Sequence, residues 1–542
     1  MKNFRLRKIR GITILSVCLI LISGFFLFSS QEQIPPSDPW EDFSGCTSIQ
    51  VGRLATTDGS VITAHSCDGN YRQWLNMVPH AKHPKGAMNK IYTGKMHTET
   101  SWDLRRIMET GEIPQVAETY AFLNVAYPCL NEHQLAIGET TIGGRRELYN
   151  SEGIFMIEEI ERVILERCKT ARDAIKLAGE LIKTYGYGDR GECITIADSK
   201  EIWHFEVFGE GPLAVGGVWA AQRIPDEHVG VSANIPRIGE LNLDDPDHFM
   251  ASENVFTVAE EMGWWDPDSG ETFKFWKAYS GRRPFSTREY FILSTMAPSL
   301  NLSFDAAELP FSVKPDKKVS VRDVMKYYRQ TYAGTDLDMT RNLMVKDRSG
   351  KTVKSPLASP FMSRDLLALL NSLKPGVAER QRTIAIAGCS YCTVLQCRDW
   401  LPAGIGGICW FAFDNPGESA RIPIFAGVTE LLPSFEIGAQ HRFRMDSAAW
   451  AFRRANRLAT INWGQAGKYI EEAIQEFEDK AFAELPQVEK KALELYEAEG
   501  GGENAEKYKA YLTGYTNDFA RAAIHKYWEL GDKFWAMFAR GF

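Results

Sequence analysis

A β-hairpin signal near residue 46 constrains the fold more than any other feature of this 542-residue chain. β-Prone runs at 49–54 and 61–64 flank the turn sequence Thr-Asp-Gly-Ser at 57–60. An Asp-Gly pair between two such runs is a strong hairpin signal. Folding the second run back on the first brings Asp68 within about one or two cross-strand steps of Cys46. The sequence therefore predicts a thiol and a carboxylate at the open end of one hairpin.

The segment before Cys46 differs from the rest of the chain. A basic flank precedes an apolar run, and a linker rich in proline and acidic residues follows. This order is typical of a signal peptide or a signal anchor. We expect residues 1–30 to be that signal and 31–45 to be a linker or propeptide, and transient anchoring through residues 11–28 stays open. The remainder would then be exported, as a periplasmic, cell-surface or secreted protein.

Composition and motif spacing exclude several function classes. The formal net charge is −8, and no basic stripe or RNA-binding aromatic signature indicates a nucleic-acid partner. No glycine loop after a strand indicates a phosphate-binding cofactor, so we expect no cofactor. Cys389, Cys392 and Cys397 lack a second ligand pair, which favours a disulfide or free core thiols over a metal. We therefore expect no metal site.

The rest of the chain predicts stacked layers of helix and sheet, an α+β fold. Apolar residues recur at helical spacing over 154–185, with a break near 171–173, and the tail at 446–542 is predicted to be helical with an interruption at 500–502. The strands that we expect downstream of the hairpin are 119–125, 134–139, 193–197, 201–207, 219–223, 230–233, 383–394, 407–413 and 422–425.

Cys46 offers a specific chemistry if the chain is cut after Gly45. An N-terminal cysteine carries a thiol and a free α-amine, whose ordinary pKa values are about 8.5 and 8. Near neutral pH the amine can take the thiol proton, which makes the residue a nucleophile with its own base. This pattern indicates acyl transfer, with Asp68 placed to hold the amine or the thiol. The alternative is a buried or disulfide-bonded structural cysteine.

A series of sequence blocks carries a family resemblance. The blocks are Cys46-Thr47-Ser48 with Val51-Gly52 and Asp58-Gly59-Ser60; residues 131–141; Gly191-Glu192 with Ile196-Ala197-Asp198; Trp219, Ala221, Arg223, Pro225-Asp226 and 231–234; and Gln396, Arg398, Leu401-Pro402, Ile405-Gly406, Trp410 and Pro423. In this order they resemble the dipeptidase A and secernin-like family. Its members are N-terminal-nucleophile cysteine hydrolases, more distantly related to penicillin V acylase and bile salt hydrolase.

The resemblance implies a four-layer αββα sandwich over residues 46–440. The helical C-terminal region, 441–542, would pack on the same domain. It also implies autocatalytic cleavage before Cys46 and hydrolysis of dipeptides through a thioester. Small peptides would then be the partners, and a homo-oligomer stays open.

The resemblance also implies roles for individual residues. Cys46 would be the nucleophile, and Asp68 the carboxylate that contacts it. The Asn131 backbone N–H and the Asn234 side chain would stabilise the oxyanion, and Arg237 would pair with a substrate carboxylate.

One departure from the family pattern concerns His65. Family members commonly carry arginine three residues before the aspartate, where this chain has His65, which we place in substrate binding. Cys67 beside Asp68 is also unusual and is predicted to be a buried thiol. An amidase for acylated amino acids or bile-acid conjugates is an alternative to the dipeptidase. A non-catalytic, surface-anchored binding protein that keeps the fold is a second.

Overall fold

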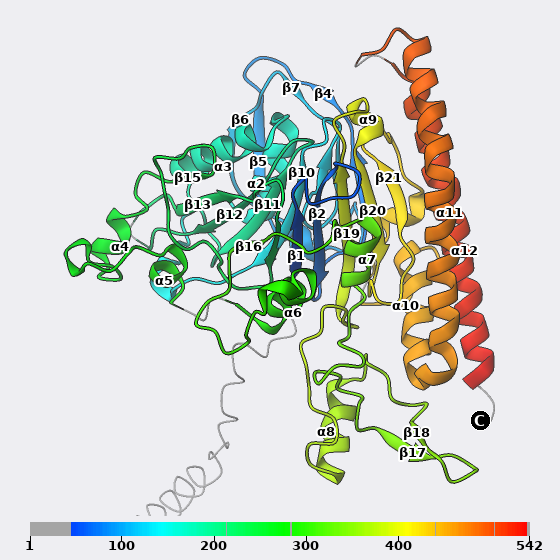
Figure 1. The fold of residues 1–542 in the computed structure, drawn as a ribbon. Helices are drawn as coiled ribbons and strands as arrows, with labels where there is room; N and C mark the ends of the chain where they lie inside the picture. Colours follow the sequence, from blue (N-terminus) through cyan, green and yellow to red (C-terminus); the bar gives the residue numbers. More distant parts are fainter. Residues whose placement is uncertain (1–44, 213, 282–284, 440, 503–504, 539–542) are drawn as a thin grey trace, which may run out of the picture. The chain divides into compact units, whose positions relative to one another are not determined.

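The computed structural model describes residues 45–212, 214–281, 285–439, 441–502 and 505–538 (Figure 1). The expected export signal at 1–30 and the linker up to residue 44 lie outside these ranges. Within them, no helix combines the length and the apolar character needed to cross a bilayer.

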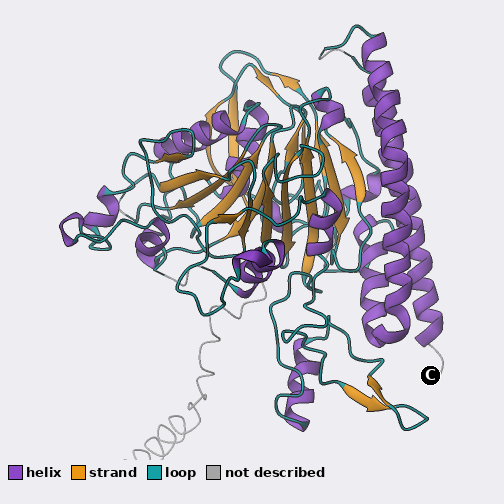
Figure 2. Cartoon of the chain, in the orientation of Figure 1, coloured by secondary structure: helices purple, strands orange, loops and turns teal. Residues whose placement is uncertain are grey.

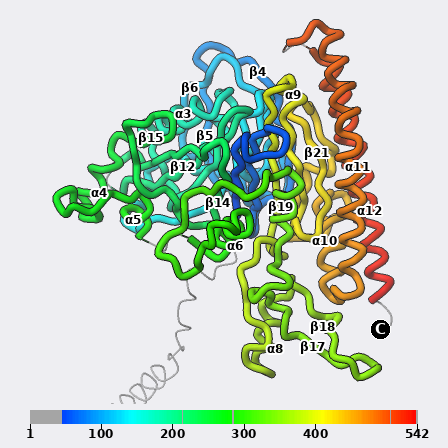
Figure 3. The backbone as a smooth tube through the Cα atoms, in the orientation of Figure 1, coloured from blue at the N-terminus to red at the C-terminus, as the bar shows by residue number. Residues whose placement is uncertain are grey.

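The first sheet has seven strands in the order β16-β14-β1-β2-β19-β20-β21, and every neighbouring pair is antiparallel. The predicted hairpin is confirmed, because Thr47 of β1 lies opposite Ser66 of β2. Figure 3 shows this early part of the chain, in blue, beside the much later β19. The strands are β1 (Thr47–Val51), β2 (Val61–Asp68), β14 (Val229–Ser232), β16 (Ser312–Val313), β19 (Cys389–Cys397), β20 (Ile408–Phe413) and β21 (Ile422–Phe425).

The second sheet has eight strands in the order β15-β13-β12-β11-β10-β9-β8-β3. It packs on the first sheet mainly through β10 against β2. β1, β2, β11 and β12 are buried along their whole length, so the sheets enclose an apolar core. The strands are β3 (Asn76–Val78), β8 (Phe122–Asn124), β9 (Leu130–Asn131), β10 (Ala136–Thr141), β11 (Glu192–Ala197), β12 (Ile202–Phe208), β13 (Val218–Arg223) and β15 (Phe249–Ala251).

Helices cover the two sheets on their outer faces (Figure 2). α2 (Ile157–Arg167) and α3 (Ala171–Tyr185) pack on the second sheet, and the break between them falls slightly before the predicted position. The Thr170 hydroxyl caps α3 by accepting from the Asp173 N–H, which sets this break. α10 (Ala448–Ala459), α11 (Trp463–Ala498) and α12 (Lys507–Phe538) form the helical tail, and α10 and α12 contact β20 and β21.

Short elements join these layers. The predicted strand at 383–394 begins only at Cys389, because residues 383–388 form a loop whose Gly388 carbonyl accepts from the Gly69 N–H just after β2. The remaining helices are α4 (Thr257–Glu261), α5 (Phe275–Tyr279), α6 (Thr287–Met296), α7 (Val321–Tyr327), α8 (Arg364–Leu373) and α9 (Ala403–Gly406). The remaining strands pair as β4 (Ala81–Lys82) with β7 (Glu118–Thr119), β5 (Met88–Thr93) with β6 (Met108–Pro114), and β17 (Met344–Lys346) with β18 (Thr352–Lys354). The chain is thus α+β.

Candidate active site

Cys46 lies at the start of β1, in the middle of the first sheet. The Gly45 N–H donates to the Asp68 carbonyl at 3.0 Å, and Thr47 pairs with Ser66, so Cys46 stands opposite Cys67. Cys46 and Asp68 are both fully buried. The structure therefore places Cys46 and Asp68 in neighbouring positions at the open end of the hairpin, through the backbone bond between Gly45 and Asp68.

Arg382 holds the Asp68 carboxylate and the peptide group before Cys46. Its Nη2 donates to Asp68 Oδ2 and to the Gly45 carbonyl, both at 2.5 Å. The Ser66 hydroxyl also donates to Oδ2, at 3.2 Å. Asp68 Oδ1 is buried and accepts no hydrogen bond from a residue that the structure describes. One carboxylate oxygen thus stays available for a further donor near Cys46.

Arg288, near the start of α6, links Cys46 to Asn234. Its Nη1 donates to the Cys46 carbonyl at 2.6 Å, and its Nη2 donates to Asn234 Oδ1 at 2.7 Å. The Asn234 amide then donates to the Thr141 carbonyl at 2.7 Å, which leaves one amide hydrogen for another acceptor. A capping box between Ser286 and Glu289 fixes this end of α6. The helix start therefore sets the orientation of Asn234.

Gly45 is in close contact with Asn234. A Cβ atom built on Gly45 would lie 2.3 Å from Asn234 Oδ1, well inside van der Waals contact. Only glycine fits before Cys46 while Asn234 keeps this position. The peptide bond between Gly45 and Cys46 is therefore packed directly against the side chain that the sequence analysis placed in oxyanion stabilisation.

Burial governs protonation around the thiol. It raises the pKa of Cys46 well above the ordinary thiol value, and the neighbouring Cys67 thiol raises it further. Burial also lowers the pKa of His65 to about 4. His65 is 2% exposed, and its Nδ1 lies 2.5 Å from the Glu139 carbonyl oxygen and 3.2 Å from the Glu139 backbone nitrogen. His65 is thus neutral at neutral pH, and the cation beside Asp68 is Arg382.

Two residues with expected roles lie apart from this network. The Asn131 N–H donates to the Leu135 carbonyl at 3.0 Å, and its side-chain amide donates to the Leu165 and Cys168 carbonyls. Asn131 therefore organises its own turn, and no hydrogen bond joins it to Cys46 within the described residues.

Arg237 is likewise engaged elsewhere. Its Nη2 donates to the Pro310 carbonyl at 2.6 Å, and its backbone N–H is bonded to the Glu206 carboxylate. The guanidinium thus fastens the loop at 309–310.

Three residues of the network were missed by sequence reasoning. Arg288 and Arg382 come from segments far along the chain, where nothing in the local sequence distinguishes them. Thr141 closes the segment 131–141, and its carbonyl anchors Asn234. Its position at the end of this sequence block could have indicated that it belongs to the site.

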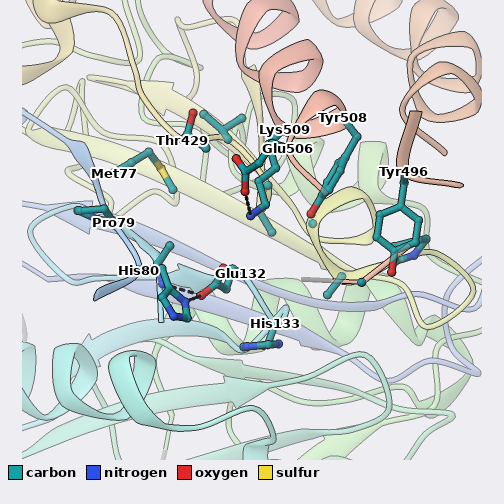
Figure 4. Close-up of a pocket in the computed structure, with 18 of the residues that line it drawn as sticks. Met77, Pro79, His80, Glu132, His133, Thr429, Tyr496, Glu506, Tyr508 and Lys509 are labelled. Atoms are coloured by element: carbon teal, nitrogen blue, oxygen red, sulfur yellow. Dashed lines mark hydrogen bonds and ion pairs between the residues drawn. The ribbon is translucent and has the colours of Figure 1, made fainter. Parts of the chain in front are cut away.

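A separate cavity of about 360 Å³ lies elsewhere in the structure (Figure 4). His80, Glu132, His133 and Tyr508 are among its lining residues, and His80 Nδ1 lies 2.6 Å from Glu132 Oε1. The lining does not include Cys46 or the residues bonded to it. The cavity therefore lacks the thiol chemistry found at β1.

A family comparison matches most of the chain. Residues 45–476 match the model of peptidase family C69, and the match begins one residue before Cys46. The chain belongs to peptidase family C69. The resemblance drawn from the sequence blocks is confirmed. In this C69 member, Cys46 is the second residue of the matched region.

Curated relatives of this C69 member cover most of its length. A probable dipeptidase from Salmonella dublin is 26% identical over 413 residues, which is 72% of this chain and 83% of that protein. A probable dipeptidase from Latilactobacillus sakei is 21% identical over 474 residues, or 80% and 86%. Dipeptidase A from Lactobacillus helveticus is 22% identical over 469 residues, or 82% and 87%.

Proposed function

We propose that this protein is an exported cysteine dipeptidase that activates itself by cutting the bond between Gly45 and Cys46. The observation that carries the proposal is the arrangement of that bond: the thiol lies beside it, Arg382 holds the Gly45 carbonyl, and Arg288 holds the Cys46 carbonyl. The names of the relatives support dipeptides as the substrates. The two packed sheets and their outer helices support the αββα sandwich of N-terminal-nucleophile hydrolases.

Self-cleavage starts with attack of the Cys46 thiol on the Gly45 carbonyl carbon. The developing oxyanion receives the hydrogen bond from Arg382, and the tetrahedral intermediate collapses with cleavage of the C–N bond. The acyl group is now on sulfur, and the proton that the thiol lost is on the Cys46 nitrogen. Water then hydrolyses the thioester, which releases a chain ending in the Gly45 carboxylate and restores the thiol. The new α-amine can donate to Asp68 Oδ1.

Dipeptide hydrolysis repeats this chemistry on an external peptide bond. The α-amine of Cys46 takes the thiol proton, and the sulfur attacks the substrate carbonyl. The remaining amide hydrogen of Asn234 is directed to the oxyanion, an interaction whose loss typically lowers the rate by about 10²–10³. The ammonium returns its proton to the leaving amine. Water, activated by the same amine, then hydrolyses the thioester and frees the second product.

The test compares Cys46→Ala and Cys46→Ser with the unchanged protein. We expect the alanine variant to retain residues 31–45, as judged by intact mass, and to hydrolyse no dipeptide. Cys168→Ala, which removes another buried cysteine, serves as the matched control and should be processed and active. Dipeptide hydrolysis by Cys46→Ala would overturn the proposal. Faster cleavage of acylated amino acids than of dipeptides would assign the protein as an amidase instead.

A further inference from the structure

We propose that Cys46, His65 and Cys67 form a binding site for a thiophilic divalent cation such as Zn²⁺, which masks the nucleophile. One candidate ligand atom from each side chain lies within 4.8 Å of the other two, and all three residues are buried. Among the described residues this is the one such group of three or more. The sequence had predicted no metal, because it offered no paired ligand spacing.

The sheet register brings the two sulfur atoms together. Cys46 and Cys67 lie directly opposite each other on β1 and β2. The cross-strand pair on one side of them is Gly45 with Asp68, and the pair on the other side is Thr47 with Ser66. In antiparallel sheets such non-hydrogen-bonded pairs have Cα atoms about 4.5 Å apart and side chains on the same face. His65 precedes Cys67 by two residues on β2, so it shares this face.

The state of the His65 ring is a second, independent observation. Its Nδ1 lies 2.5 Å from the Glu139 carbonyl oxygen and 3.2 Å from the Glu139 backbone nitrogen, and in the tautomer that donates Nδ1–H to this carbonyl the lone pair of the neutral ring is on Nε2. Nε2 is buried and has no hydrogen-bond partner within the described residues. A histidine that binds a metal through one nitrogen commonly donates its other N–H to a backbone carbonyl. His65 is therefore already oriented as a ligand.

The donor set selects the kind of metal. Two thiolates and an imidazole suit Zn²⁺, whereas Ca²⁺ and Mg²⁺ require oxygen ligands. Binding is balanced by proton release: the Cys46 and Cys67 thiols each lose a proton as their sulfur atoms bind the cation. A water molecule can take the fourth position. With its sulfur bound to metal, Cys46 cannot attack a carbonyl.

The test uses Co²⁺ as a spectroscopic probe on the purified, metal-free protein. We expect thiolate-to-cobalt charge-transfer absorption that one equivalent of Zn²⁺ abolishes and that excess Ca²⁺ or Mg²⁺ does not. Cys67→Ser and His65→Gln should each weaken binding by at least about tenfold. Cys389→Ser is the matched control, since Cys389 lies opposite Asp68 on β19 and outside the group.

The readout is independent of the proposed peptidase activity. If Co²⁺ gives no charge-transfer band, or if Cys67→Ser binds as tightly as the unchanged protein, the metal site is refuted even when dipeptides are hydrolysed. If the band is present and dipeptides are not hydrolysed, the metal site stands and the proposed function fails. Circular dichroism of each variant identifies a loss of fold, and His65→Asn then replaces an unfolded His65→Gln.

Discussion

At the scale of single residues, two guanidinium groups hold the peptide that carries the nucleophile, with Arg288 buried and Arg382 partly buried. Arg382 donates to the Gly45 carbonyl and Arg288 to the Cys46 carbonyl, so consecutive carbonyl groups are both fixed. Burial lowers the pKa of Arg288 to about 10, which leaves it charged at neutral pH. The two cations thus fix the carbonyl groups before and after the residue that carries the reacting sulfur.

Arg382→Gln should slow self-cleavage by about 10²–10³, because the oxyanion formed at Gly45 loses a charged donor. The measurement is the time course of the Cys46 N-terminus by mass spectrometry after synthesis. Arg444→Gln, which removes a surface arginine paired with Asp446, should be processed at the normal rate. Equal rates for the two variants would show that Arg382 has no part in this step.

Gly45→Val should block processing while leaving the fold intact, since its side chain would collide with Asn234 and move the Gly45 carbonyl away from Arg382. Intact mass reports the uncut chain, and circular dichroism reports the fold. Gly239→Val is the control, because a Cβ at Gly239 meets no atom within 4 Å. Normal processing of Gly45→Val would mean that Asn234 can move away without loss.

The site could be predicted from sequence only where its geometry is local. Cys46 and Asp68 lie on one hairpin, so the turn signal at 57–60 was enough to predict that they are neighbours. Arg382 is 337 residues from Gly45, and no periodic pattern links distant loops to a strand end. Asn131 was placed in the site by resemblance, and its hydrogen bonds instead hold its own turn.

At the scale of elements, the helix α2 was predicted correctly, but the burial of its acidic residues was not. Its apolar positions were expected to face the core, but Glu158 and Glu161 are buried as well. The helix lies between the second sheet and the segment that holds β5 and β7, so few positions face solvent. Burial, and after it the neighbouring charge of Glu159, raise the pKa of Glu158 to about 8. Glu158 therefore carries its proton in the folded protein at neutral pH.

Glu158→Gln should flatten the fall in stability between about pH 4.5 and 8. Between about pH 4.5 and 8 the folded state keeps a proton that the unfolded state releases, so stability falls as pH rises, by at most about 1.4 kcal/mol per pH unit. Urea unfolding at pH 5 and at pH 8 measures the difference. The exposed Glu180→Gln on α3 is the control and should follow the unchanged protein. A parallel pH dependence for Glu158→Gln would contradict this interpretation.

At the scale of the whole molecule, the helical tail is joined to the sheets by buried charge as well as by apolar packing. Glu478 of α11 pairs with Arg421, which is fully buried beside β21, and with Arg329, just after α7. Periodicity predicted the tail helices, because long amphipathic patterns are local. It could not predict this ion-paired contact, nor the positions of the helices that were expected between 240 and 380, whose few turns leave little pattern.

Glu478→Ala should destabilise the protein by about 3–5 kcal/mol, because it leaves the Arg421 charge buried with its carboxylate partner removed. The neighbouring Asp479→Ala is the matched control. Its pair with Arg322 is largely solvent-exposed, so its loss should cost about 0–1 kcal/mol. Urea unfolding of both variants provides the comparison, and similar values would show that the tail is held by apolar contacts alone.

The central position of β2 has a consequence for how the protein loses activity. β1, β2 and β19 have hydrogen-bonded neighbours on both sides, so the backbone around Cys46 cannot separate unless the sheet itself comes apart. Amide protons in such strands exchange with deuterium only through global unfolding. On heating, dipeptide hydrolysis and near-ultraviolet circular dichroism should therefore disappear together in one transition, without an earlier step in which a loosened active site fails first.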